Sequence, residues 1–249
     1  MVPAGGHVKV RRTWYAFEGS RWAEFFTMLH PPYTGMVLCY VALGAFLAPV
    51  IHWDRLFWSL VAYLLGLGVG AHALDQISGR PYGRSFTERE LWVIGTSTLA
   101  LASLIGAYYA VTLSPWLWVF IGLGAFFAVT YPLGGSFGGR FHTDFWFVVS
   151  WGMLPFLTSY FLQTLTLTFS SLLMAGALGG TAAMEITLSR WVRALRRHPA
   201  TLRMVHADGS EEEWDLWRLI GKPERALKLL VVTVYLLAAS VGAWRFFGR

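Results

Sequence analysis

The stretch "LFWSLVAYLLGLGVGAHALDQISGRPYG", residues 56–83, decides the fold class. A run without charged side chains begins at Leu56, and about 20 such residues suffice for a membrane-spanning helix. The run ends on His72 and Asp75, which lie one helical turn apart, and the chain then turns through Gly79-Arg80-Pro81. Ionisable side chains at membrane depth are costly and usually face the bundle interior or a water-filled cavity. The stretch therefore predicts a membrane helix that presents His72 and Asp75 to a polar interior.

The composition extends this prediction to the whole chain. Of 249 residues, 55% are hydrophobic and 14% are charged, against roughly 25% charged residues in soluble domains. One soluble core could not bury so much apolar surface, so we expect a single all-α, polytopic membrane domain over residues 1–249. The net charge of +6 then marks a cytoplasmic face rather than a nucleic-acid partner. Cys39 is the only cysteine, which excludes an intrachain disulfide.

Seven apolar spans of membrane-crossing length can be placed on the sequence. They cover about 34–53, 56–77, 91–112, 115–134, 144–164, 168–190 and 228–246. With a cytoplasmic N-terminus, 17 of the 20 Lys and Arg residues fall on the cytoplasmic side and 3 on the other. Basic residues are enriched on the cytoplasmic side of membrane proteins. We therefore predict a multi-pass protein of the cell membrane with its C-terminus outside.

Two local signals refine this plan. Ser85 and Glu88 have the spacing of a capping box at the start of the third span. Residues 191–227, between the sixth and seventh spans, carry both charge signs and predict a cytoplasmic loop or cap of about 35 residues. Within it, the turn signal "ADGS" at 207–210 fits either a hairpin or a helical cap.

Ionisable residues from several spans converge on the predicted cytoplasmic side. We expect His72, Asp75 and Glu185 to be the catalytic residues at a shared polar cavity. The candidate metal ligands are Asp75, Glu185, His72, His142 and Asp144, and the candidate substrate-binding arginines are Arg80, Arg84, Arg140 and Arg190. Carboxylates beside arginines suit Mg²⁺ and a diphosphate, because the metal bridges acid and phosphate oxygens while arginine neutralises the remaining charge. Below this rim, Trp, Phe and Leu of the second, fourth and fifth spans would line a groove for a prenyl or acyl chain.

The order of three segments resembles the UbiA superfamily of intramembrane prenyltransferases. These segments are "MLHPPYTGMVLCYVALGAFLAP" (28–49), "AHALDQISGRPYG" (71–83) and "TYPLGG" (130–135). The resemblance covers roughly residues 25–225. It implies a helical bundle around a cavity open to lipid, in which Asp motifs and Mg²⁺ bind a polyprenyl diphosphate. The prenyl chain would then be transferred to a lipophilic acceptor.

The sequence departs from the family's motif Asn-Asp-x-x-Asp-x-x-x-Asp. Ala71 replaces the Asn, His72 the first Asp and Gly79 the last, while Asp75 keeps the middle Asp; Glu185 is what remains of the second motif. A histidine beside carboxylates suits Fe, Zn or Mn better than Mg²⁺. Three functions therefore stay open: a prenyltransferase-like enzyme acting on an isoprenoid, a membrane enzyme with a His/carboxylate metal site, and a non-catalytic lipid-binding or structural subunit of a membrane complex.

Overall fold

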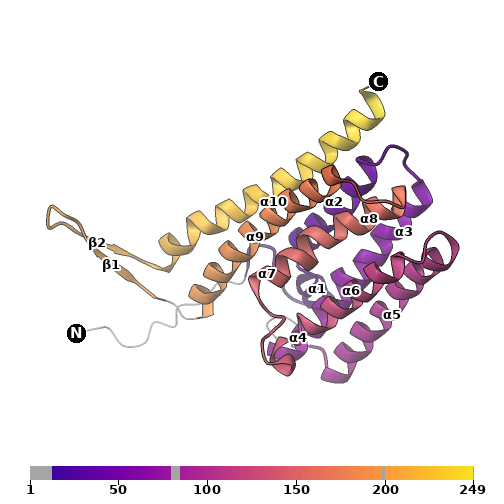
Figure 1. The fold of residues 1–249 in the computed structure, drawn as a ribbon. Helices are drawn as coiled ribbons and strands as arrows, with labels where there is room; N and C mark the ends of the chain where they lie inside the picture. Colours follow the sequence, from indigo (N-terminus) through magenta and orange to yellow (C-terminus); the bar gives the residue numbers. More distant parts are fainter. Residues whose placement is uncertain (1–12, 80–84, 198–199, 249) are drawn as a thin grey trace.

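The computed structural model describes residues 13–79, 85–197 and 200–248 and is almost entirely helical (Figure 1). The α-helices are α1 (Arg21–Met28), α2 (Pro31–Phe46), α3 (Trp53–Tyr63), α4 (His72–Gly79), α5 (Glu88–Thr112), α6 (Leu117–Thr130), α7 (Asp144–Phe147), α8 (Leu154–Thr164), α9 (Phe169–Arg197) and α10 (Leu216–Phe247). Two π-helical segments, η1 (Leu64–Ala71) and η3 (Val148–Met153), join α3 to α4 and α7 to α8, and a short 3-10 turn, η2 (Gly134–Phe137), follows α6. The class is all-α, as predicted.

A helix lies on each of the seven predicted apolar spans. Within the described residues, five helices are long and apolar enough to cross a membrane, and this length and composition support a membrane protein. They cover Trp53–Ile77, Glu88–Thr112, Asp144–Thr164, Phe169–Arg197 and Leu216–Phe247. The helices α2 and α6 are apolar but shorter. The predicted first span extends too far, because α2 ends at Phe46, shortly before Pro49, and a proline in a helix interior removes a hydrogen bond and clashes with the preceding turn.

The start of α5 lies two residues later than the predicted capping box. Thr87 is the N-cap and accepts from the backbone N–H of Glu90, whose side chain bonds back to the Thr87 backbone. Both Ser85 and Thr87 are followed by a glutamate at the third position. Thr87 has the extended N-cap backbone, so the reciprocal pair forms there. Ser85 instead donates its backbone N–H to Glu24 of α1 at 2.9 Å.

The predicted loop 191–227 is largely helical in the structure. Helix α9 continues to Arg197 and α10 already begins at Leu216, so that only a short connection remains. Asp215 caps α10 by accepting from the backbone N–H of Arg218 at 2.9 Å. Val192 of α9 packs against Ile220 of α10 in a small buried cluster, which explains why these amphipathic segments extend the helices.

The connection itself is an antiparallel hairpin. Strands β1 (Leu202–Val205) and β2 (Glu211–Trp214) pair with Leu202 opposite Trp214. Gly209 adopts a positive φ of 83° in the turn, as the sequence "ADGS" indicated. The hairpin projects away from the bundle (Figure 1), so of the two predicted alternatives the structure shows the hairpin.

The bundle core brings α2, α8, α9 and α10 together around Tyr40 and Phe156, both almost fully buried. A second cluster around Trp151 joins η1, η3 and α9. Close approach here depends on glycine: a Cβ at Gly152 would lie 2.8 Å from the Cβ of Ala182 and 2.9 Å from the Cα of Gly179. This contact fixes η3 against α9 and thereby positions the residues described next.

Candidate functional site

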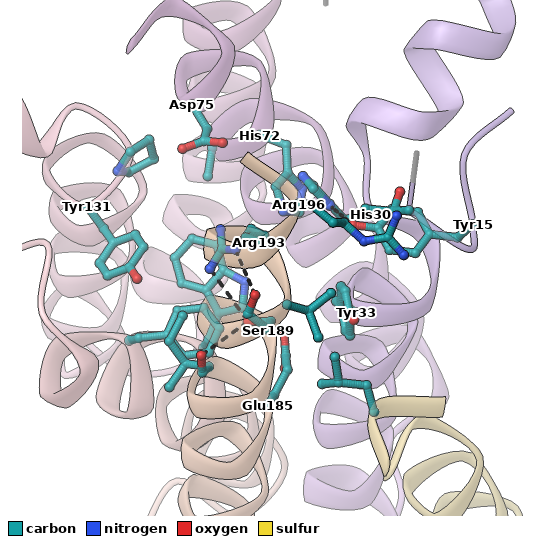
Figure 2. Close-up of a pocket in the computed structure, with 18 of the residues that line it drawn as sticks. Tyr15, His30, Tyr33, His72, Asp75, Tyr131, Glu185, Ser189, Arg193 and Arg196 are labelled. Atoms are coloured by element: carbon teal, nitrogen blue, oxygen red, sulfur yellow. Dashed lines mark hydrogen bonds between the residues drawn. The ribbon is translucent and has the colours of Figure 1, made fainter. Parts of the chain in front are cut away.

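A polar cavity of about 120 Å³ lies at the end of the bundle where α2 begins and α4 and α9 end. Its polar wall includes His30, His72, Asp75, His142, Glu185 and Arg193. Figure 2 shows the labelled side chains around this space, with His72 and Asp75 on one side and Glu185, Ser189 and Arg193 on α9. The structure therefore brings His72, Asp75 and Glu185 to one cavity.

His72 and Asp75 belong to the first turn of α4, directly after the π-helical segment η1. Such segments occur frequently at functional sites. The Nδ1 atom of His72 lies 3.0 Å from the backbone oxygen of Gly68. Because a carbonyl oxygen only accepts, Nδ1 carries the proton and donates, which leaves the Nε2 lone pair of the neutral ring available. Asp75 follows one turn later on the same helical face.

Glu185 comes from α9 and is only 7% exposed. In the described part of the chain no side chain or backbone group donates a hydrogen bond to it, although buried carboxylates normally have partners. Arg193 lies two turns further along α9 and donates from Nε to the backbone oxygen of Ser189 at 3.3 Å. Arg193 forms no ion pair with a carboxylate of the described residues. A carboxylate and a guanidinium that form no ion pair with any described residue thus line the same cavity.

His30 completes the wall in a strained backbone conformation. Its φ is 46° and ψ is 59°, in the left-handed region, immediately before Pro31, and such strain in a non-glycine residue clusters at functional sites. The hydroxyl of Tyr15 lies 2.6 Å from His30 Nδ1, and the rings of His30 and His72 are 4.9 Å apart. Burial holds the pKa of His30 well below its usual value, and the nearby His72 and Arg193 lower this pKa further.

Several wall residues were not in the predicted site. They are Tyr15, His30, Tyr33, Ser189, Arg193, Arg196 and Glu224. Arg196 and Glu224 form a largely buried ion pair at 3.0 Å between α9 and α10. Arg193 and Arg196 follow Glu185 at near-helical spacing. A prediction that continued the sixth helix to Arg197 would therefore have placed them near Glu185.

Asp144, Arg190 and Arg140, which were also predicted as site residues, lie away from the cavity. Asp144 and Arg190 form an ion pair with each other at 3.0 Å, and both are about half exposed, so they meet at the surface and do not line the cavity. Arg140 is exposed in the turn after η2 and does not line it either. His142 lines the cavity, and its Nδ1 lies 2.8 Å from the backbone oxygen of Tyr131. Arg80 and Arg84 lie outside the described residues.

The predicted metal ligands do not form a closed set. Across residues 13–79, 85–197 and 200–248, no three His, Cys, Asp or Glu side chains form a group that would hold a metal ion. Asp144 is engaged by Arg190, and Asp75 and Glu185 stand on different helices. The described side chains therefore do not offer the carboxylate cradle that Mg²⁺ requires, and Mg²⁺, Fe, Zn and Mn stay predictions from the sequence.

An apolar cavity of about 130 Å³ lies next to the polar one. It is lined by residues of α3 with η1, α5, α6, and η3 with α8, among them Leu67, Leu99, Phe120 and Phe127. Trp151 of η3 lines both cavities. An apolar space below the polar rim was expected, with walls from the second, fourth and fifth spans; the structure adds the third.

No family model, curated protein or solved structure matches the chain. The geometry of the two cavities is therefore the basis for the proposal that follows.

Proposed function

We propose that this chain is a UbiA-like integral membrane enzyme that acts on an isoprenoid diphosphate. The single observation that supports it best is the junction at Trp151 between a polar cavity containing Arg193 and an apolar cavity. A prenyl diphosphate has the matching division into an anionic head and an apolar tail. Ligand sites of this kind combine an apolar lining with a few polar groups that fix orientation.

Each polar residue has a distinct role in this proposal. Arg193 binds the diphosphate oxygens, because a guanidinium forms strong charge-assisted hydrogen bonds with phosphate. His72 accepts the proton of the acceptor at Nε2, since its Nδ1 already donates to Gly68. In the transfer, the bond from the prenyl C1 to the diphosphate oxygen breaks with its electron pair leaving on diphosphate. The new bond forms between C1 and the acceptor atom that loses the proton to His72.

A second candidate function is a His/carboxylate metal enzyme, and one observation favours it. Metal-binding histidines almost always donate their second ring nitrogen to a carbonyl or carboxylate, which fixes the ring. His72 and His142 both have Nδ1 within hydrogen-bond distance of a backbone oxygen. Elemental analysis of the purified protein tests this candidate: about one Fe, Zn or Mn per chain supports it, and less than a tenth of that rejects it.

We propose further that all seven apolar helices cross the cell membrane, with the polar cavity at the cytoplasmic end. The support is the distribution of basic residues, 17 on one side against 3 on the other. On this arrangement α2 and α6 cross as short helices beside the five longer ones. The substrate reaches the site as a membrane lipid, and the proposed fold is a UbiA-like bundle with seven spans, fewer than the nine typical of that family.

Binding of farnesyl diphosphate to the protein in lipid nanodiscs, with and without Mg²⁺, tests the main proposal. We expect binding of the diphosphate but at least tenfold weaker binding of farnesol, which lacks the anionic head. Arg193→Gln should weaken diphosphate binding at least tenfold, about 1.4 kcal/mol. Arg218→Gln is the matched control, because Arg218 pairs with Glu212 near the hairpin, away from the cavity. Equal binding by Arg193→Gln and the control would reject the assignment, and farnesol binding as tight as that of the diphosphate would indicate a non-catalytic lipid-binding protein.

A further inference from the structure

The short helix α1 is fixed to the first turn of α5, on the outer side of the bundle. Arg21 of α1 forms an ion pair with Glu90 of α5 at 2.5 Å, and Glu24 accepts from the backbone N–H of Ser85 at 2.9 Å. Met28 packs with Phe86 in a buried cluster beneath this contact. The two helices therefore hold a defined position relative to each other.

A groove of about 330 Å³ runs along this junction. It is lined by Arg21, Arg89 and Glu90 at one end and by Val93 and Ile94 one helical turn further along α5. Arg21 is paired with Glu90. Arg89 is exposed, and no described carboxylate pairs with it. The groove thus has a net positive charge at one end and an apolar wall at the other.

The exposed aromatic side chains around the groove indicate its depth in the membrane. Trp22 and Phe26 of α1 are 73% and 52% exposed, and Trp92 of α5 is 39% exposed. Tryptophan is enriched at the membrane–water interface, at the level of the lipid headgroups. Further along α5, Leu101 and Leu104 point outward and are more than half exposed, as suits a lipid-facing helix. The charged end of the groove therefore lies at headgroup level and its apolar end at the level of the first acyl carbons.

We propose that this groove binds an anionic phospholipid, with its phosphate on Arg89 and Arg21 and its acyl chain along Val93 and Ile94. Among the residues that line the groove, two arginines against one glutamate leave one positive charge for the lipid. Basic side chains near the membrane surface attract anionic lipids. The groove lies on the outer side of α5 and shares no lining residue with the polar cavity. It is independent of the proposed enzymatic function.

Native mass spectrometry of the protein released from detergent, titrated with phosphatidylglycerol or phosphatidylcholine of identical chains, tests the proposal. We expect the phosphatidylglycerol adduct to be the stronger one, and Arg89→Gln to weaken it at least fivefold, about 1 kcal/mol. Arg225→Gln, an exposed arginine of α10 outside the groove, is the control that measures general electrostatic attraction. Inorganic phosphate at the same concentration should not displace the lipid, because it has no chain to contact Val93 and Ile94.

Glu90→Gln provides a test of opposite sign. Glutamine also serves in a capping box, so α5 keeps its N-terminal cap while the groove loses its negative charge and Arg21 its ion pair. We expect phosphatidylglycerol to bind more tightly to this variant than to the wild type. The proposal is overturned if Arg89→Gln and Arg225→Gln weaken binding equally, if phosphatidylcholine binds as well as phosphatidylglycerol, if inorganic phosphate displaces the lipid, or if Glu90→Gln weakens binding.

Discussion

Asp75 lines the polar cavity one helical turn after His72. Within the described residues it accepts no hydrogen bond and forms no ion pair. A carboxylate placed in this way contributes little to folding, because removal of its charge also removes the cost of desolvating it. We propose that it contributes to ligand binding instead, by interacting with a cation or with a proton of the substrate.

Asp75→Asn keeps the size of the side chain and removes its charge. We expect the affinity for farnesyl diphosphate, or the metal content, to fall at least tenfold, about 1.4 kcal/mol, while the thermal unfolding temperature stays the same or rises. Binding measurements and unfolding curves on the same preparation separate the two effects. Unchanged binding together with a lower unfolding temperature would assign Asp75 a structural role.

His30 makes the stability of the fold depend on pH. Its pKa in the folded protein lies below the usual value of about 6.5. Below pH 6.5 the unfolded chain therefore binds a proton that the folded chain does not, and stability falls by up to about 1.4 kcal/mol per pH unit. The groups near His30 include Tyr15, His72 and Arg193, and Figure 2 shows Arg196 beside it as well.

His30→Asn should reduce this loss of stability between pH 7 and pH 5, since asparagine does not titrate and tolerates the left-handed backbone. Unfolding temperatures measured at half-unit pH steps provide the comparison. His206→Asn, on the projecting hairpin, is the matched control. A pH dependence of His30→Asn identical to that of the wild type would show that the pKa of His30 is the same in the folded and the unfolded chain.

The site was predictable from the sequence where a charged residue interrupts an apolar run. His72, Asp75 and Glu185 interrupt such runs, and the structure places all three at one cavity. The position of Arg193 depended on where α9 ends, and the role of His30 depends on a left-handed backbone that no sequence pattern reveals. Asp144 and Arg190 were assigned to the site by depth alone, whereas their mutual ion pair holds them at the surface.

The contact between η3 and α9 can be tested through its glycine. A Cβ at residue 152 would lie within 3 Å of both Ala182 and the backbone of Gly179, so Gly152→Ala requires one of the two segments to move. We expect a loss of about 1–3 kcal/mol in unfolding free energy, typical of overpacking, and weaker ligand binding because Trp151 and Glu185 shift with these segments.

Gly176→Ala is the control for this substitution. Residue 176 lies on α9, where a new Cβ would have no atom within 4 Å, and alanine favours a helix more than glycine does. We expect unchanged or slightly higher stability. A comparable loss of stability in both variants would mean that the cost comes from α9 itself and not from its contact with η3.

The apolar spans predicted the positions of the helices well, but they predicted the ends of the helices less well. Pro49 shortens α2, and packing between Val192 and Ile220 extends α9 and α10 into a segment that its charges predicted to be a loop. The glycines of the second span lie close to side chains of neighbouring helices, as expected for packing. Gly176 and Gly180 of the sixth span instead face open space. The sequence shows that residues are small without showing which neighbour uses the space.

The whole chain should cross the membrane an odd number of times. With seven crossings and basic residues concentrated at the end that carries the cavity, we expect a reporter fused after Arg249 to lie outside the cell and one fused before Met1 to lie in the cytoplasm. Paired reporters of cytoplasmic and external activity provide the measurement. A cytoplasmic reporter after Arg249 would mean an even number of crossings and would move the cavity or the C-terminus to the other face.

The two short helices have a consequence for the membrane around the protein. Helices α2 and α6, of 16 and 14 residues, rise about 24 Å and 21 Å, less than the thickness of a hydrocarbon core of about 30 Å. In the seven-crossing arrangement proposed above, the bilayer beside α6, whose outer side chains are exposed, must thin to match this helix, at a cost of fractions of a kcal/mol per Å. The end of α6 borders the polar cavity through Tyr131 and Pro132. We therefore expect the bilayer to be thinnest beside this side of the cavity, where a lipid headgroup drifting in the leaflet would be delivered sideways, without leaving the membrane.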